Sequence, residues 1–260
     1  MNTLEDLERE FNFTYPALYR QLYDDKMLDW GVEGSDWYTL VFPRLKENPP
    51  LLLFGNDIEI WDPIAYRHAI REIINHEVYD INPKYRMVPL AKNGAGDLYV
   101  FQLDMETNGE VPITFFPHDD SEAEIIAKNL QDFIFRQLLE SLTEMDEYSM
   151  FEGDSEEKIK IHLQNQLNTH RKYLTSKQIE ILEDIYTRDI FEYTYKTPNG
   201  GKFEAEGLLT FDELEKIINK EIAFEKLNKK FDYMNSQGLG YIIDKECDKD
   251  VWFDQKYWME

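Results

Sequence analysis

The spacing of apolar residues predicts helices from one end of the chain to the other. Near the N-terminus, Leu4, Leu7 and Phe11 fall on one helical face behind a capping box that begins at Thr3. Further helices are expected to begin near Thr14, Asp62, Ser121, Ile159, Thr175 and Thr210. At most of these starts a Ser, Thr or Asp stands where its side chain can accept a hydrogen bond from a first-turn amide.

Between these segments, short apolar or alternating runs predict strands. They cover 51–54, 58–61, 87–90, 98–103, 111–116 and 191–195. Asn108-Gly109 separates two of them and tolerates the positive φ angles of a tight hairpin turn. A second hairpin is expected where aromatic residues alternate over 191–195 ahead of a turn at 198–201. The sequence therefore predicts helices mixed with strands that hairpins connect.

The composition changes after about Thr143. Residues 144–157, EMDEYSMFEGDSEE, are acidic, contain a glycine and show no apolar periodicity, which is typical of a boundary. We therefore expect two regions, 1–145 and 146–260, of which the second is rich in helices and contains the later hairpin. This second region is either an extension of the first or a separate small domain, and both interpretations stay open at this point.

A large excess of acidic residues is the most unusual global feature of the composition. The chain carries 28 Lys and Arg residues against 52 Asp and Glu residues, a formal net charge of -24. Such a charge repels phosphate groups over a long range, so neither nucleic acid nor an anionic membrane surface is expected as a direct partner. A cationic partner would be attracted. The alternative is that the acidic surface only keeps the protein soluble.

Cysteine content and apolar runs indicate the compartment. A single cysteine, Cys247, excludes an intrachain disulfide and a thiolate metal cluster. The first ten residues, MNTLEDLERE, carry four acids and lack the apolar core of a signal peptide. The longest aliphatic block, Leu51–Phe54, is far too short to cross a bilayer. We therefore expect a cytosolic protein.

The stretch 89–104, PLAKNGAGDLYVFQLD, places two glycines one residue apart beside an apolar run, as a nucleotide-binding loop does. A dinucleotide fingerprint would need a third glycine where Tyr99 stands, followed by a helix, and a Walker loop would need Gly-Lys-Ser/Thr. Neither requirement is met. Gly94 and Gly96 therefore indicate a turn before the strand at 98–103, and no nucleotide cofactor is expected.

The residue types that usually bind metals or perform catalysis form no recognised motif. The histidines lack HxxxH and HExxH spacing, and we expect His162 and His170 to lie at the surface or half-buried. Adjacent acids such as Asp119-Asp120 leave an acidic-site hydrolase as an alternative. Otherwise no catalytic residue, cofactor or metal is expected.

Tryptophans and acidic residues stand next to one another in the first quarter of the chain. Trp and Tyr bury large areas at low entropic cost, and carboxylates attract Lys and Arg, so an exposed cluster of both suits a protein-binding face. The residues that we expect to contact a partner are Asp24, Asp25, Asp29, Trp30, Asp36, Trp37, Glu59, Trp61 and Asp62. In the alternative interpretation, the tryptophans belong to the core and the acids are merely solvated.

Four stretches of the first half follow one another in a characteristic order: FTYPALYRQLYDD, MVPLAKNGAGDLYVFQLD, GEVPITFFPHDD and IAKNLQDFIFRQL. In this order they resemble the opening helix, the central signature, the following strand and the closing helix of the SUKH superfamily, also called the Smi and Knr family. The resemblance covers about Leu4 to Leu142. The stretch DDKMLDWG departs from the family, which often has Asn-Gly after the first helix pair, so the loop there is expected to be remodelled.

This resemblance implies an α+β fold with a mixed, mostly antiparallel sheet packed by helices, and no cofactor. Bacterial members resemble one another as immunity proteins, which bind and block a toxin delivered by neighbouring cells, whereas fungal members look like cell-wall and signalling regulators. The implied partner is a cognate protein toxin, expected to be basic, such as a cytosol-acting nuclease delivered by contact-dependent or type VI secretion. The remaining alternative is a regulatory interaction module without a toxin.

Overall fold

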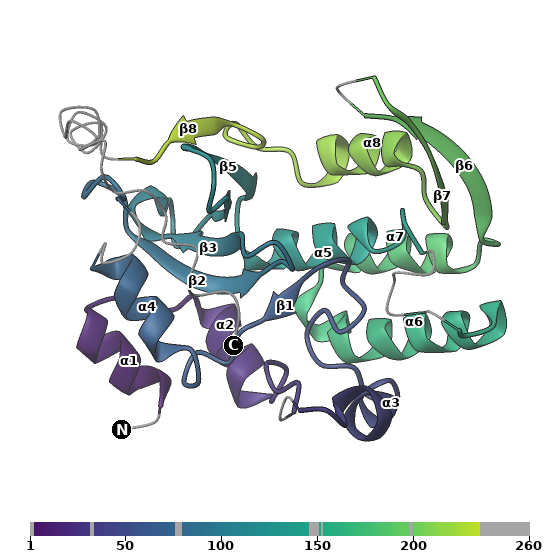
Figure 1. Cartoon of the computed structure of the whole chain (residues 1–260), viewed down its shortest axis with the longest axis horizontal. Coiled ribbons are helices and arrows are strands. Elements are labelled where there is room, and N and C mark those ends of the chain that lie inside the picture. Colours follow the sequence, from purple (N-terminus) through teal and green to yellow (C-terminus); the bar gives the residue numbers. More distant parts are fainter. Residues whose placement is uncertain are drawn as a thin grey trace, which may run out of the picture.

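The chain folds into helices around an antiparallel sheet, with a separate two-stranded hairpin at one end (Figure 1). A computed structural model describes residues 3–31, 34–75, 80–145, 151, 153–197 and 200–234. The helices are α1 (Leu4–Phe11), α2 (Ala17–Asp24), α3 (Phe42–Leu45), α4 (Arg67–Ile74), α5 (Leu130–Glu140), α6 (Glu156–His170), α7 (Ser176–Tyr186) and α8 (Phe211–Glu221). The strands are β1 (Glu59–Ile60), β2 (Met87–Lys92), β3 (Leu98–Gln102), β4 (Ile113–Phe116), β5 (Glu122–Ala127), β6 (Phe191–Lys196), β7 (Lys202–Gly207) and β8 (Lys230–Asp232). These elements confirm the expected α+β fold.

The main sheet has the strand order β1-β2-β3-β4-β5-β8, and every neighbouring pair is antiparallel. The expected turn between β3 and β4 is confirmed, because Asn108 and Gly109 have φ angles of 55° and 82°. Side chains alternate between the two faces of a strand. Along β3, Leu98 and Val100 belong to a core cluster that includes α4, whereas Phe101 belongs to a second cluster with α1, α2 and α5. Helices therefore cover both faces of the sheet.

The region after residue 145 is joined to the first region by a strand pairing and a shared core. β8 pairs with β5, so the later part of the chain supplies the last strand of the main sheet. One core cluster runs from Leu4 to Ile222 and includes Phe133 of α5, Leu163 of α6 and Leu182 of α7. These contacts favour an extension of the first region over a separate small domain, and the division at residue 145 stays a prediction.

Where the helix signal is local, the structure agrees with the sequence. Thr3 caps α1 by accepting a first-turn amide, and complete capping boxes begin α7 and α8 at Thr175 and Thr210. Two helices start later than expected, since Pro16 immediately precedes α2 and α4 begins only at Arg67. The threonine caps thus fix the starts of α1, α7 and α8, whereas neither Asp62 nor Pro16 marks the first residue of the helix that follows it.

The helix expected from Ser121 is wrong at its start. Residues Glu122–Ala127 form β5, and α5 begins only after Asn129, whose side chain accepts a hydrogen bond from the amide of Asp132. The capping-box pattern is overridden because this segment lies between β4 and β8 and pairs with both. The sequence pattern around Ser121 gives no information about either of these two partner strands.

The strand expected at 51–54 is also wrong, and only Glu59–Ile60 of the strand expected at 58–61 forms, as β1. Residues 51–54 make a buried turn in which Leu52 has a φ angle of 55°. The Leu52 amide donates to Nε2 of His170 in α6, 3.1 Å away. This turn is therefore held by a residue 118 positions further along the chain.

His170 is buried, whereas the sequence indicated a surface or half-buried position. The residue is 0% exposed, and its Nδ1 lies 2.7 Å from the carbonyl oxygen of Gln166. Because the Leu52 amide can only donate, Nε2 is the acceptor and Nδ1 carries the proton. Burial lowers the pKa of His170 to about 4, so the ring is neutral near pH 7. His162, half-buried beside Asp154, agrees with the expectation.

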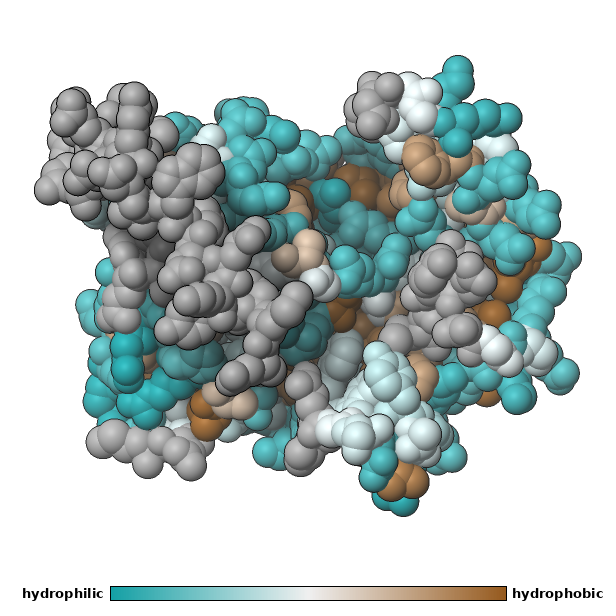
Figure 2. Space-filling view, in the orientation of Figure 1, coloured by the Kyte–Doolittle hydropathy of each residue, from teal (hydrophilic) through white to brown (hydrophobic). Residues whose placement is uncertain are grey.

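The face of the molecule drawn in Figure 2 is largely hydrophilic, with apolar residues visible in a hollow beside the hairpin. Among the helices in the described part of the chain, none combines the length and the apolar composition that a bilayer crossing needs. The acidic and aromatic tail from Tyr241, which contains Cys247, lies outside the described residues.

Replacing Gly207 by alanine is expected to destabilise the fold by about 2–3 kcal/mol. Gly207 ends β7, and an added Cβ would overlap the carbonyl oxygen of Leu142 and lie 2.8 Å from that of Thr143. Relief would disturb the hydrogen bond from the Leu208 amide to Leu142, which attaches the hairpin to the end of α5. Urea unfolding measures the loss. Gly34→Ala is the control, because its Cβ would meet no described atom within 4 Å, and equal midpoints for both variants would contradict this account.

Candidate functional site

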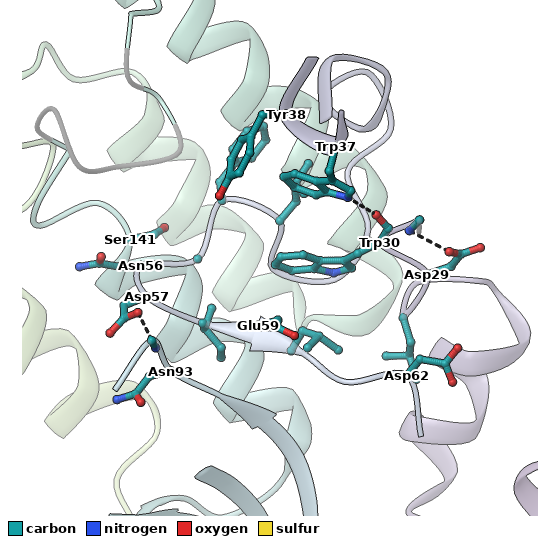
Figure 3. A pocket seen from close by; sticks show the side chains of 18 of the residues that line it. Asp29, Trp30, Trp37, Tyr38, Asn56, Asp57, Glu59, Asp62, Asn93 and Ser141 are labelled. Atoms are coloured by element: carbon teal, nitrogen blue, oxygen red, sulfur yellow. Dashed lines mark hydrogen bonds between the residues drawn. The ribbon is translucent and has the colours of Figure 1, made fainter. Parts of the chain in front are cut away.

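A cavity of about 910 Å³ opens between the loop that precedes α3 and the turn that precedes β1 (Figure 3). Its walls come from residues within 28–38 and 53–66, from the β2–β3 turn at 93–94, and from residues 141, 144 and 151 beyond α5. These segments are distant in sequence, so only the tertiary fold assembles them. We call this the acidic cavity.

Five carboxylates line the acidic cavity: Asp29, Asp57, Glu59, Asp62 and Glu144. No Lys or Arg occurs among the lining residues that the structure describes. Neighbouring negative charges repel one another, and a cation that enters the cavity relieves this repulsion. The cavity therefore favours a positively charged ligand group.

Hydrogen bonds fix the orientation of these carboxylates. Three of them accept backbone amides of the turns around the cavity: Asp29 at 2.9 Å, Asp57 at 2.7 Å and Asp62 at 2.8 Å. Glu59 and Glu144 each accept a tyrosine hydroxyl, at 3.1 and 2.8 Å. Glu59 also pairs with the lysine that ends β2, at 3.0 Å. Because the carboxylates are already held in place, binding a partner costs little side-chain entropy.

Two tryptophans lie across the cavity from Asp57, Glu59 and Asp62 in Figure 3. The indole N–H of Trp30 donates to the backbone carbonyl oxygen of the buried turn at Leu51, 3.1 Å away, and that of Trp37 donates to the carbonyl oxygen of Trp30 at 2.8 Å. Both rings are partly buried and thus anchored at one edge. Tyr38, 69% exposed, contacts Trp37 edge to face with ring centroids 4.9 Å apart.

Fixed carboxylates opposite aromatic rings are suited to bind a cation. A guanidinium or ammonium group gains charge-assisted hydrogen bonds from the carboxylates and attraction from the ring faces. A cavity of about 910 Å³ is large enough for at least one long side chain of a partner protein. The arrangement therefore supports recognition of Lys or Arg.

The structure brings together most of the residues that the sequence predicted to contact a partner. Those lining the acidic cavity are Asp29, Trp30, Trp37, Glu59 and Asp62. They come from two separate stretches of sequence, which the fold places on opposite walls. Trp30 and Trp37 are half-buried at the cavity, and each ring is anchored by the hydrogen bond of its indole N–H. Trp37 also stacks on Phe42, with ring centroids 5.3 Å apart.

Three of the predicted acids lie outside the cavity lining. Asp25 accepts a hydrogen bond from the Tyr173 hydroxyl at 2.8 Å and pairs with Lys172 at 2.8 Å. The hydrogen bond from Lys172, followed by that from Tyr173, lowers the pKa of Asp25. Asp24 and Asp36 are exposed at other positions. Asp25 thus already has intramolecular partners, whereas Asp24 and Asp36 stay predictions for the rim of a partner surface.

Trp61 differs from the other predicted tryptophans. It is 8% exposed and stacks on Tyr66, with ring centroids 4.6 Å apart and planes 2° from parallel. Its neighbours are the core residues of the α4 side of the sheet. For Trp61 the structure therefore agrees with the core interpretation.

Two acids of the cavity, Asp57 and Glu144, were missed by the sequence analysis. Asp57 lies between two expected strands, directly after Gly55-Asn56, and that pair indicated only a turn. Glu144 lies in the stretch that indicated a domain boundary. Both join the cavity through long-range packing rather than through any motif.

The acid pair Asp119-Asp120 divides between two roles. Asp120 accepts the amide of Ser121 at 2.6 Å. Asp119 lies with Asp97 and His118, and their possible ligand atoms all fall within 4.8 Å of one another, a spacing that could hold a metal ion. Burial opposes ionisation of Asp97, but hydrogen bonds from the backbone and ring of His118 outweigh it and lower the pKa of Asp97. Asp120 thus holds the turn before β5, whereas Asp119 belongs to the cluster with Asp97 and His118.

A comparison with known protein families gives a match for the first half of the chain. The family model described as SMI1 / KNR4 family (SUKH-1) matches residues 2–136, just over half of the chain. Most of the acidic cavity lies within this range, whereas α6, α7, α8 and the hairpin β6–β7 lie beyond it. No curated protein and no solved structure matches the chain.

Proposed function

Since the chain belongs to the SMI1 / KNR4 family (SUKH-1), we propose that it is an immunity protein that neutralises a basic protein toxin in the cytosol by binding it at the acidic cavity. The observation that carries this proposal is the set of five oriented carboxylates facing two anchored tryptophans. An inhibitor of this kind works by occupying a surface of its target. It needs no catalytic group of its own.

An arginine of the toxin fits the cavity best. A planar guanidinium can stack on the face of Trp30 or Trp37 while its N–H groups donate to Asp57 or Glu59 on the opposite wall. A lysine would gain the charge attraction without the planar stacking. We therefore expect the toxin residue that enters the cavity to be an arginine at the centre of the interface.

The toxin class that fits this surface is a nuclease or a similar enzyme, delivered into the cytosol by contact-dependent or type VI secretion. Such an enzyme contacts phosphates through Lys and Arg in its substrate groove. An inhibitor with a net charge of -24 would approach that groove rapidly through electrostatic steering. By inserting carboxylates and rings where phosphates bind, it would exclude the nucleic acid.

Expression of the toxin domain encoded beside this gene tests the proposal. We expect cells that produce the toxin domain alone to stop growing, and cells that also produce this protein to grow. The two proteins should co-purify as a stoichiometric complex whose affinity falls as salt is raised. Growth arrest that persists in the presence of the intact protein would contradict an immunity role. Co-purification with several endogenous proteins, and no toxin gene nearby, would instead support a regulatory module.

A further inference from the structure

The hairpin β6–β7 has an unpaired strand edge. Within the described residues β6 pairs only with β7, and Figure 1 shows β6 on the outer side of the hairpin. Glu206 of β7 stands opposite Glu192, and its carbonyl oxygen accepts the Met145 amide from outside the hairpin at 2.7 Å. Glu192 and Glu206 therefore form a non-hydrogen-bonded pair of the antiparallel ladder. The backbone N–H and C=O groups of each residue point away from the opposite strand. By the same alternation, the backbone groups of Glu192, Thr194 and Lys196 face the free edge.

A second cavity of about 1030 Å³ lies at the base of this hairpin. Its carboxylates come from the hairpin and from the segment that begins α6: Glu192, Glu204, Glu206, Asp154 and Glu156. Asp154 and Glu156 already pair with lysines. The three hairpin glutamates form no ion pair with any residue that the structure describes.

The arrangement of these hairpin glutamates leaves a charge uncompensated. Glu192 and Glu206 stand directly opposite each other, and like charges in that position destabilise a strand pair. Glu204, two residues along β7, points to the same face, which we call the glutamate face. Lys196 and Lys202 stand opposite each other on this face near the turn, so its three glutamates outnumber its two lysines. A cationic side chain placed over this face would remove the repulsion.

The other face of the hairpin is aromatic. Along β6, Phe191, Tyr193 and Tyr195 alternate with the polar residues, and Phe203 stands opposite Tyr195 on β7. Phe191 is 37% exposed and Phe203 is 51% exposed. Figure 2 shows apolar surface among hydrophilic residues over this part of the molecule. Tyr193 and Tyr195 are half-buried, and their hydroxyls donate to the Thr143 carbonyl oxygen and to Glu144. A strand added at the β6 edge would therefore meet Glu192 on one face, with Lys196 toward the turn, and the exposed ring of Phe191 on the other.

We propose that the free edge of β6 binds an extended segment of a partner protein in which basic and apolar residues alternate. The segment adds a strand to the hairpin through the outward backbone groups of Glu192, Thr194 and Lys196. Its basic side chains fall on the glutamate face and its apolar side chains on the aromatic face, because side chains alternate along a strand. This site lies beyond the residues that the family model matches and does not depend on the proposed immunity role.

Charge decides which occupant fits this edge. Two copies of the chain could also pair their β6 edges, but each carries a net charge of -24 and they repel each other at long range. A basic segment is attracted by the same charge. The basic segment of a partner is therefore the occupant that the surface favours.

A fluorescent peptide of alternating lysine and valine is the probe for this site. In about 150 mM salt, which screens long-range attraction, we expect it to bind the full chain, as measured by fluorescence anisotropy. The variant E192Q/E204Q/E206Q should bind it about tenfold more weakly. The control variant with the same loss of charge is E106Q/E180Q/E215Q, at exposed positions elsewhere. Equal weakening in both variants would overturn the proposal, since it would reduce binding to net charge alone.

Two isomeric peptides test the strand edge itself. Backbone N-methylation at the lysines alone, or at the valines alone, removes the N–H groups from only one edge of an extended peptide. We expect one isomer to bind like the parent peptide and the other to lose binding. Equal behaviour of the two isomers would overturn the strand-addition geometry. Thr194→Pro, which removes an outward N–H but no bond to β7, should also abolish binding while the melting temperature stays near that of the wild type.

Two further outcomes separate this site from the other candidates. The acidic-cavity variant D29N/D57N/D62N should keep the peptide affinity, and a loss there with retention in the hairpin variant would overturn the assignment to β6. Sedimentation should show a monomer that binds one peptide. A dimer that Thr194→Pro dissociates would overturn the proposal in favour of a second copy. The peptide experiments do not measure protection of cells from the toxin. Either proposal, the hairpin site or the immunity role, can therefore be contradicted without affecting the other.

Discussion

Neutralising the acidic cavity through Asp29→Asn, Asp57→Asn and Asp62→Asn is expected to weaken toxin binding by roughly a hundredfold, about 3 kcal/mol. Each of these side chains accepts a backbone amide through one oxygen, and an asparagine oxygen can accept the same bond. The turns should therefore keep their shape while three negative charges disappear. The dissociation constant, measured by isothermal titration calorimetry, reports this loss.

A matched variant separates the cavity from the overall charge. E106Q/E180Q/E215Q removes the same number of charges at exposed positions outside the lining of the acidic cavity. We expect it to slow association slightly and to leave the dissociation rate unchanged, because distant charges act mainly on the encounter. Similar affinities for the two triple variants would contradict a specific role of the cavity and would reduce the acidic surface to general steering.

Replacing His170 by alanine is expected to cost about 3 kcal/mol of folding free energy. The change leaves a cavity in the core and removes the acceptor of the Leu52 amide, in a turn whose leucines are 0% exposed. This turn also carries the Leu51 carbonyl oxygen that anchors Trp30. We therefore expect weaker toxin binding together with lower stability. Chemical denaturation at pH 7 measures the loss of stability, and His68→Ala, at an exposed position of α4, is the control.

His170 also makes stability depend on pH. Burial lowers its pKa to about 4 from the usual 6.5, so the unfolded chain binds a proton at a higher pH than the folded chain does. The wild type should therefore lose about 3 kcal/mol more than His170→Ala as the pH falls from 6.5 to 4. Parallel stability curves for the two proteins over this range would contradict a neutral buried ring.

Local chemistry explains which parts of the fold the sequence could predict. The capping boxes at Thr175 and Thr210 and the positive φ turn at Asn108-Gly109 depend on neighbouring residues, and all of them are confirmed. The segment after Ser121 has a capping pattern as well, yet it forms β5 because strands from both sides pair with it. Residues 51–54 look like a strand but turn around the side chain of His170. Such long-range partners carry no local signal.

In the candidate site, too, the sequence predicted what depends on neighbouring residues and missed what depends on long-range packing. Trp30 and Trp37 stand beside acids in the sequence, which was enough to predict a cluster, and the structure places both at the acidic cavity. Adjacency could not show that Trp61, with the same acidic neighbours, turns into the core under Tyr66. Nor could it indicate Glu144, which reaches the cavity only because the chain beyond α5 passes it. The sequence therefore indicates which kinds of residue form the site. Which individual residues line the acidic cavity depends on tertiary packing.

Carboxyl footprinting of the complex tests the central claim most directly. A carbodiimide couples an amine to exposed carboxylates, and mass spectrometry of peptides locates each modified residue in the free protein and in the complex with its toxin. We predict that the complex protects Asp29, Asp57 and Asp62, while Glu106 and Glu215 react equally in both states. Unchanged labelling of the three cavity acids, in a complex that still forms, would contradict the claim that the partner inserts a basic group there.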